Sequence, residues 1–148
     1  MQILIVNKIK LIEPSSIALR RTLEVVQCYD ENYFIDCINL KIDDLQDDHL
    51  VTFDDMITIH LFSNILDIDT FDIYDLFRKI LSNSGRHLFL AVSHDRNFDG
   101  GAPRLEGLYN AFNCKSNAHI FKEIKSEIRR FNCSNGMPAI CFNIEVEV

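Results

Sequence analysis

An acidic side chain at the end of an apolar stretch is the residue of this sequence best placed to do chemistry. Glu13 ends the run Lys10-Leu11-Ile12 and precedes Pro14-Ser15-Ser16. An acid that ends a strand of a nucleotide-binding sheet normally holds a ribose, provided that a glycine-rich loop upstream lets the cofactor approach the backbone. No glycine precedes Gly85. The sequence therefore contains one half of such a site.

Glu13 also has a structural explanation. Pro14 disfavours helix at Glu13, and Ser15 or Ser16 suits the N-cap of a helix over 17–29. A carboxylate just before a helix is stabilised by the positive end of the helix dipole. Both explanations of Glu13 stay open.

Two further groups of polar residues follow expected strands. An expected strand over 33–42 is followed by four acidic residues, Asp43, Asp44, Asp47 and Asp48. An expected strand over 56–62 is followed by three polar residues, Ser63, Asn64 and Asp67. The acids lack the alternating oxygen ligands and the turn glycine of a calcium loop, and a solvated surface explains them better than a binding site does. Asn64 and Asp67 also suit turns that close a strand.

Histidines and cysteines show no pattern typical of a metal site. The five histidines have no paired helical spacing, and none lies near a cysteine pair, so we expect no metal. His60, inside an apolar strand, is expected in the core. The five cysteines have no Cys-x-x-Cys spacing and are odd in number, which fits a reducing cytoplasm.

Composition limits the class of protein. With 148 residues, 47% of them hydrophobic, the chain is expected to form a single domain over 1–148 with a sizeable core. A net charge of -7 argues against direct nucleic-acid binding, which needs clustered Lys and Arg. We find no signal peptide and no apolar run of the roughly 20 residues that span a membrane. We expect a soluble, cytoplasmic protein.

Apolar runs of strand length alternate with segments of helical period, which predicts an α/β fold. A helix is expected over 71–84, with Thr70 as its candidate N-cap and Gly85 as its stop. The nearly continuous apolar sequence over 86–93 predicts a strand buried on both faces, as in a parallel sheet.

The last third of the chain allows two structures. A short helix is expected over 105–112. Residues 120–128 fit either a helix or a strand. As a strand, they would pair with an expected strand over 139–148 through a turn near Asn135-Gly136.

The order of these elements resembles the class I S-adenosylmethionine-dependent methyltransferases. The resemblance covers about residues 9–148 and rests on Leu11-Ile12-Glu13-Pro14-Ser15 and on His60-Leu61-Phe62-Ser63-Asn64-Ile65-Leu66-Asp67. It implies a Rossmann-like methyltransferase sheet with a C-terminal antiparallel hairpin, and it therefore favours a strand over residues 120–128. In that family the acid after the second strand binds the ribose of S-adenosylmethionine, which corresponds to Glu13.

The resemblance also implies roles for the other polar residues. An acid after the family's third strand often contacts the adenine amine, which corresponds to Asp43 or Asp44. The residues that close the fourth strand face the cofactor and the substrate, and here these are Ser63, Asn64 and Asp67.

The family's first strand and glycine-rich turn have no match, so the expected sheet is N-terminally incomplete. In the family this strand lies between the second and fourth strands. Each buried unpaired backbone group costs about 1–3 kcal/mol, against a stability of roughly 5–15 kcal/mol. We therefore expect a homo-oligomer, or a partner protein that supplies a strand.

Three functional hypotheses follow. The first is a non-catalytic or accessory methyltransferase-like subunit, a pseudoenzyme in an oligomer or complex of bacterial or phage type. The second is an active methyltransferase completed by a partner chain, since methyl transfer depends chiefly on alignment. The third is an acidic inhibitor or antitoxin-like module that binds a basic protein through Asp47 and Asp48.

Overall fold

The computed structural model describes residues 6–29, 33–52, 56–66, 69–95, 101–114, 121 and 123–148. The chain divides into two compact units, residues 1–49 and residues 50–148, and each is described by itself. That the whole chain forms one domain stays a prediction. Among the described helices, none is both long and apolar enough to cross a membrane.

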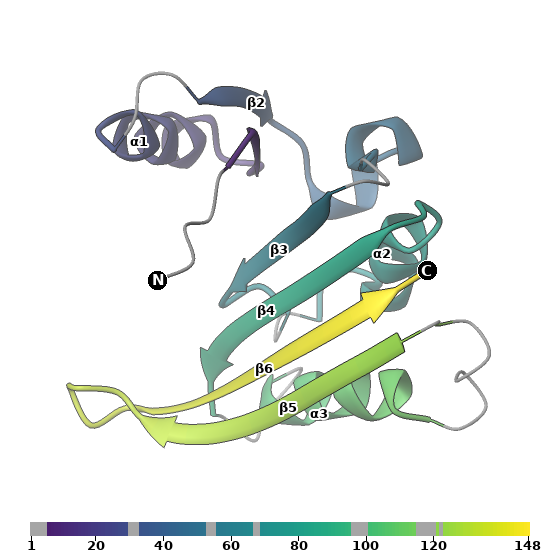
Figure 1. Cartoon of the computed structure of the whole chain (residues 1–148). Helices are drawn as coiled ribbons and strands as arrows, with labels where there is room; N and C mark the ends of the chain where they lie inside the picture. The colour runs from purple at the N-terminus through teal and green to yellow at the C-terminus, as the bar shows by residue number, and fades with distance from the viewer. Residues whose placement is uncertain are drawn as a thin grey trace, which may run out of the picture. The chain divides into compact units, whose positions relative to one another are not determined.

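The first unit contains a parallel pair of strands joined by a helix. Strand β1 (Lys8–Ile12) pairs with β2 (Phe34–Ile38), and α1 (Ser16–Gln27) connects them (Figure 1). Parallel strands need such a crossover. The N-cap prediction is confirmed at Ser15, whose hydroxyl accepts the backbone N–H of Ala18 at 3.3 Å. The 3-10 turns η1 (Ile42–Asp44) and η2 (Asp47–Leu50) follow β2.

The second unit contains a mixed sheet of four strands in the order β3-β4-β6-β5. Its strands are β3 (Ile57–Ser63), β4 (Arg86–His94), β5 (Glu123–Asn132) and β6 (Pro138–Glu147). β3 and β4 are parallel, whereas β6 runs antiparallel to both of its neighbours. The predicted C-terminal hairpin is therefore confirmed as β5 and β6.

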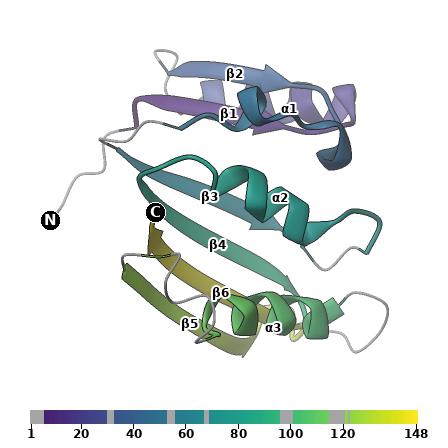
Figure 2. The same cartoon turned by 90° about the vertical axis from the view of Figure 1, so that its right-hand side faces the viewer.

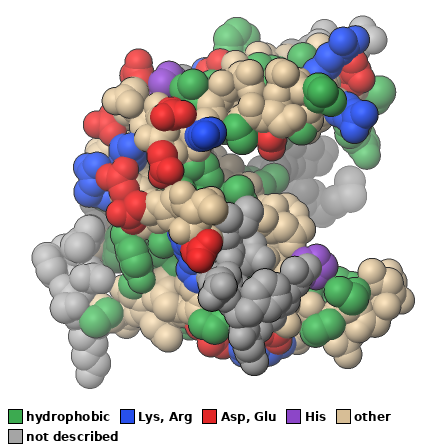
Figure 3. Space-filling view, turned by 180° about the vertical axis from the view of Figure 1, so that it is seen from behind, with side chains coloured by type: hydrophobic (Ala, Val, Ile, Leu, Met, Phe, Trp, Pro, Cys, Tyr) green, Lys and Arg blue, Asp and Glu red, His purple; other side chains and the backbone are tan. Residues whose placement is uncertain are grey.

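Helices α2 (Ile73–Ile80) and α3 (Gly101–Phe112) lie on the same face of this sheet (Figure 2). Phe77 of α2 and Phe112 of α3 both pack against Phe89 of β4, with ring centroids 4.8 and 5.7 Å away. Buried aromatic rings contribute much of the apolar area of a core, so the core of this unit lies between the helices and this face. Seen from behind, acidic and basic side chains are interspersed (Figure 3).

The prediction that 86–93 is buried on both faces was wrong. His87 and Phe89 are fully buried, whereas Leu90 and Val92 are 36% and 37% exposed. The reason is that the described helices α2 and α3 both cover the same face, so alternate side chains of β4 remain open to solvent.

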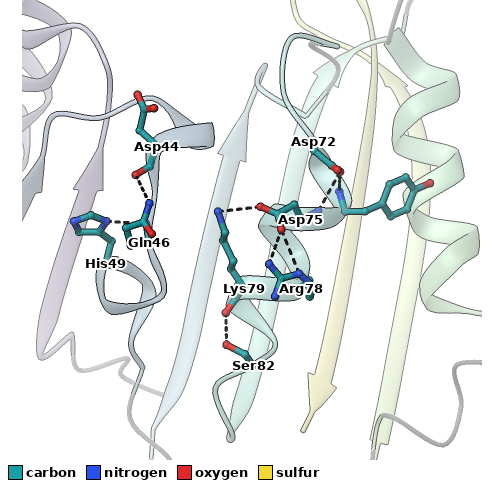
Figure 4. Close-up of polar contacts among 9 residues, drawn as sticks. Asp44, Gln46, His49, Asp72, Asp75, Arg78, Lys79 and Ser82 are labelled. Carbon is teal, nitrogen blue, oxygen red and sulfur yellow. Dashed lines mark hydrogen bonds and ion pairs between the residues drawn. The ribbon is translucent and has the colours of Figure 1, made fainter.

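The helix cap and the helix starts also differ from expectation. Asp72, not Thr70, caps α2, because its carboxylate accepts the backbone N–H groups of Tyr74 and Asp75 at 2.9 and 3.1 Å (Figure 4). Helix α3 begins at Gly101 rather than at residue 105. Pro103 is compatible with this start because proline is tolerated in the first turn of a helix.

Each unit has an edge strand that pairs on one side only among the described residues. Within these residues, β1 pairs only with β2, and β3 pairs only with β4. In the resemblance, these two strands take the places of the family's second and fourth strands.

Candidate functional site

Glu13 lies directly after β1, at the carboxyl edge of the parallel pair. Its backbone N–H donates to the carbonyl oxygen of Ile38 at 3.1 Å. Its side chain is half-buried, and carboxylate Oε1 accepts the N–H of Ser15 at 2.9 Å. The structural explanation for Glu13 is therefore supported, because the carboxylate orders the turn that leads into α1. A carboxylate has a second oxygen, so this contact leaves acceptor capacity for a ribose hydroxyl.

Asn39 also lies at this edge, and it was not among the residues predicted from the sequence. Its side-chain Nδ2 donates to the carbonyl oxygens of Glu13 and Pro14 at 2.8 and 2.9 Å. The amide therefore ties the end of β2 to the turn that carries Glu13. A polar amide directly after a strand was the only signal in the sequence, and it does not show which neighbouring strand end the amide reaches.

Asp43 and Asp44 lie in η1, and both are exposed. The backbone carbonyl of Asp44 accepts Nε2 of Gln46 at 3.3 Å, and Nδ1 of His49 accepts the backbone N–H of Gln46 at 2.9 Å (Figure 4). This network fixes the turn through backbone groups and leaves the carboxylates in solvent. The geometry supports a solvated acidic surface, and adenine contact by either acid stays a prediction.

Lys10 places a positive charge beside this acidic turn. Its ammonium donates to the backbone carbonyl of His49. Burial lowers the pKa of Lys10, and the nearby ammonium of Lys8 lowers it further, while Asp36 and Asp48 raise it. Lys10 therefore joins β1 to η2 at the cost of partial desolvation of its charge.

Ser63 and Asn64 lie at the carboxyl end of β3, where the resemblance places cofactor and substrate contacts. Both are exposed. Asn64 has a φ of 53°, in the left-handed region that asparagine tolerates better than most residues. Its N–H donates to the carbonyl oxygen of Val92 at 2.9 Å, which supports the interpretation of Asn64 as a turn former. Asp67, the third predicted residue, lies outside the described residues.

An ion network lies beyond the carboxyl end of the neighbouring strand β4. Arg130 of β5 contacts Oδ2 of Asp95 at 3.0 Å and also the carboxylate of Glu106 on α3. Glu106, and then Asp95, hold the pKa of Arg130 above its ordinary value. Both carboxylates are thus paired, which suits them to fixing α3 against the hairpin rather than to proton transfer.

The described residues present two separate polar edges. One carries Glu13 and Asn39, and the other carries Ser63 and Asn64. In open α/β sheets ligands bind outside the carboxyl ends of parallel strands, so each edge is in the position expected for half of a nucleotide site. Within the described ranges, no cluster of three or more His, Cys, Asp or Glu could hold a metal ion. The five cysteines are free thiols.

Comparison with known proteins reveals similarity at the level of fold. No protein-family model and no curated protein matches the sequence. An rRNA methylase from Streptococcus thermophilus matches with a TM-score of 0.58 and 14% identity, over 95% of this chain and 76% of that chain. A putative rRNA-methylase from Clostridium thermocellum matches with a TM-score of 0.52 and 12% identity, over 94% and 75%. The chain therefore has the Rossmann-like fold of the class I S-adenosylmethionine-dependent methyltransferases.

Proposed function

We propose that this chain is a methyltransferase-like accessory subunit that acts in an oligomer or complex and does not transfer methyl groups alone. The observation that carries the proposal is that β1 and β3 each pair with one strand only among the described residues. In the resemblance, the family's first strand pairs with the strands to which β1 and β3 correspond, and it also brings the glycine-rich turn. The lack of this one strand would therefore leave both the unpaired edges and an incomplete cofactor site.

The open edges also support assembly with another polypeptide. β1 contributes 5 residues and β3 contributes 7 residues to such an edge. Unpaired N–H and C=O groups along a strand are a template for pairing with a further strand. A partner that inserts a strand here would satisfy them, as expected for a domain that is stable in a complex.

A second candidate function is an active methyltransferase completed in trans. It is favoured by Glu13, whose half-buried carboxylate uses only Oε1 in its contact with Ser15. The similar structures are described as rRNA methylases, so RNA is the substrate class that this candidate implies. Because this chain carries a net charge of -7, the partner would supply the basic surface that RNA requires. A cytoplasmic location follows from this proposal.

Calorimetric titration of S-adenosylmethionine separates the two functions. We expect no saturable heat with the isolated chain. The second titration adds a separate polypeptide with the first strand and glycine-rich turn of an active family member. Heat that appears only in this mixture, and is lost in Glu13→Ala but kept in the control Glu24→Ala, would support the completed enzyme. Micromolar binding by the isolated chain would contradict the accessory role.

A further inference from the structure

The face of the four-stranded sheet opposite α2 and α3, here called the outer face, is apolar along β3 and β4. In Figure 1 the strands lie in front of the two helices, so this face is toward the viewer. The register places Ile59 beside Leu88 and Leu61 beside Leu90. The exposed apolar side chains of this face are Ile57, Ile59, Leu61, Leu90, Val92 and Phe131. A contiguous apolar surface of this kind is typical of an interaction site.

The outer face is hollowed along its middle. Leu61 on β3 and Phe131 on β5 flank a groove of about 670 Å³. Leu90, Val92 and Cys141 lie along it, and Glu127 and Arg129 line its side on β5. Leu61 is 74% exposed and Phe131 is 44% exposed. The surface thus has both an apolar groove and projecting apolar side chains at its borders, which makes it complementary to another copy of itself.

The charges of the outer face also suit a second copy. Along the strands, alternation places three basic and four acidic residues on this face: Arg86, Lys125, Arg129, Glu123, Glu127, Glu145 and Glu147. Arg129 contacts Glu127 at 2.6 Å, and Arg86 contacts Glu145. Three positive and four negative residues give this face a net charge of -1, whereas the whole chain carries -7. Two such faces repel each other little, and a face of this charge offers nucleic acid no net attraction.

We infer that a second copy of this chain binds the outer face, with the two copies related by a two-fold axis. Leu61 of each copy occupies the groove of the other, where Glu127 and Arg129 stay paired with each other, and the other charged residues form the rim. This arrangement has the apolar centre and polar rim of a protein interface, and a two-fold interface uses the same patch on both subunits. The inference uses the face of the sheet and not its open edge, so it is independent of the proposed function.

Sedimentation velocity over a concentration series tests the inference. The variant Leu61→Asp places a charge at the centre of the interface. Tyr74→Asp is the matched control, because Tyr74 is 59% exposed and lies on α2, against the opposite face. We expect a dimer for the wild type and for Tyr74→Asp. For Leu61→Asp the dissociation constant should rise at least about tenfold, the loss expected for one buried leucine.

A second variant guards against misfolding. Phe131→Ser removes the other border of the groove, and circular dichroism checks that both variants keep their fold. A dimer weakened by either folded variant supports the inference. A monomeric wild type, or a dimer that both folded variants retain, would overturn it. If neither variant folds, hydrogen exchange of the wild type replaces the two variants as the test. The amides of the outer face should then be protected at concentrations where the dimer forms. Exchange that does not change on dilution also overturns the inference.

Discussion

Acid is expected to destabilise the second unit through two histidines in its core. The ring of His60 stacks on Phe89 at a centroid distance of 4.7 Å, and Nε2 of His60 lies 3.1 Å from Nδ1 of His87. Nε2 of His87 lies 3.1 Å from the carbonyl oxygen of Asn83. A carbonyl only accepts, so His87 carries its proton on Nε2 and its Nδ1 accepts from His60. A second proton on His87 would place two N–H groups against each other unless His60 changed its tautomer, so it would disturb the contact between the histidines.

The direction of the pH effect follows from the pKa of His87. Burial of this fully buried ring lowers its pKa below the ordinary value, more than the hydrogen bond to Asn83 raises it. The unfolded chain therefore binds a proton below about pH 6.5 that the folded protein does not bind. The stability from His87 is complete above pH 6.5 and is lost as the pH falls toward the folded pKa. Between pH 7 and 5.5 the loss is at most about 1.2 kcal/mol, since each pH unit below the unfolded pKa contributes about 1.36 kcal/mol.

Urea denaturation at pH 7 and 5.5, at constant ionic strength, measures this loss. The variant His87→Phe keeps a ring in the core but cannot titrate, so its free energy of unfolding should change less with pH than that of the wild type. His94→Gln, at the end of the same strand, is the matched control and should behave like the wild type. Equal pH dependence in wild type and His87→Phe would refute the reasoning. An NMR titration in which His87 of the folded protein protonates near pH 6.5 would also refute it.

Two further predictions concern local hydrogen bonds. Asp72→Ala should lower the free energy of unfolding by about 1 kcal/mol because it removes the cap of α2. Thr70→Ala should change this free energy by less than about 0.5 kcal/mol. Equal effects of the two variants in chemical denaturation would contradict Asp72 as the cap. Asn39→Ala should lower the free energy of unfolding by about 1–2 kcal/mol, because it removes the donors to the carbonyl groups of Glu13 and Pro14. It should also speed amide hydrogen exchange at Glu13. Unchanged exchange would show that these hydrogen bonds do not stabilise the turn.

The hairpin shows how far local sequence chemistry can predict. Residues 120–128 fit either a helix or a strand, the resemblance favoured the strand, and β5 is a strand. Gly136 has a φ of 80°, a conformation that glycine adopts without strain. Its N–H donates to the carbonyl of Cys133 at 2.8 Å. The turn was predictable because its requirement for glycine is local.

Features that depend on distant elements were not predictable. The sequence of β4 is apolar at nearly every position, so either face could have been the covered one. Which face is open depends on α2 and α3 lying on the same side of the sheet. Asn39 was missed for a similar reason, because its function depends on the strand end that folding brings beside it.

Assembly is coupled to ligand binding in the proposed function. Glu13 follows β1, and Asn64 follows β3, and each of these strands pairs on one side only among the described residues. In the resemblance, a first strand supplied by a partner would bring the glycine-rich turn that touches the methionine part of the cofactor. S-adenosylmethionine must then strengthen the complex by the same factor by which the partner strengthens cofactor binding, because linkage is reciprocal. A partner whose affinity did not change with saturating cofactor would add a strand without completing the site, and would leave the accessory role as the function of this chain.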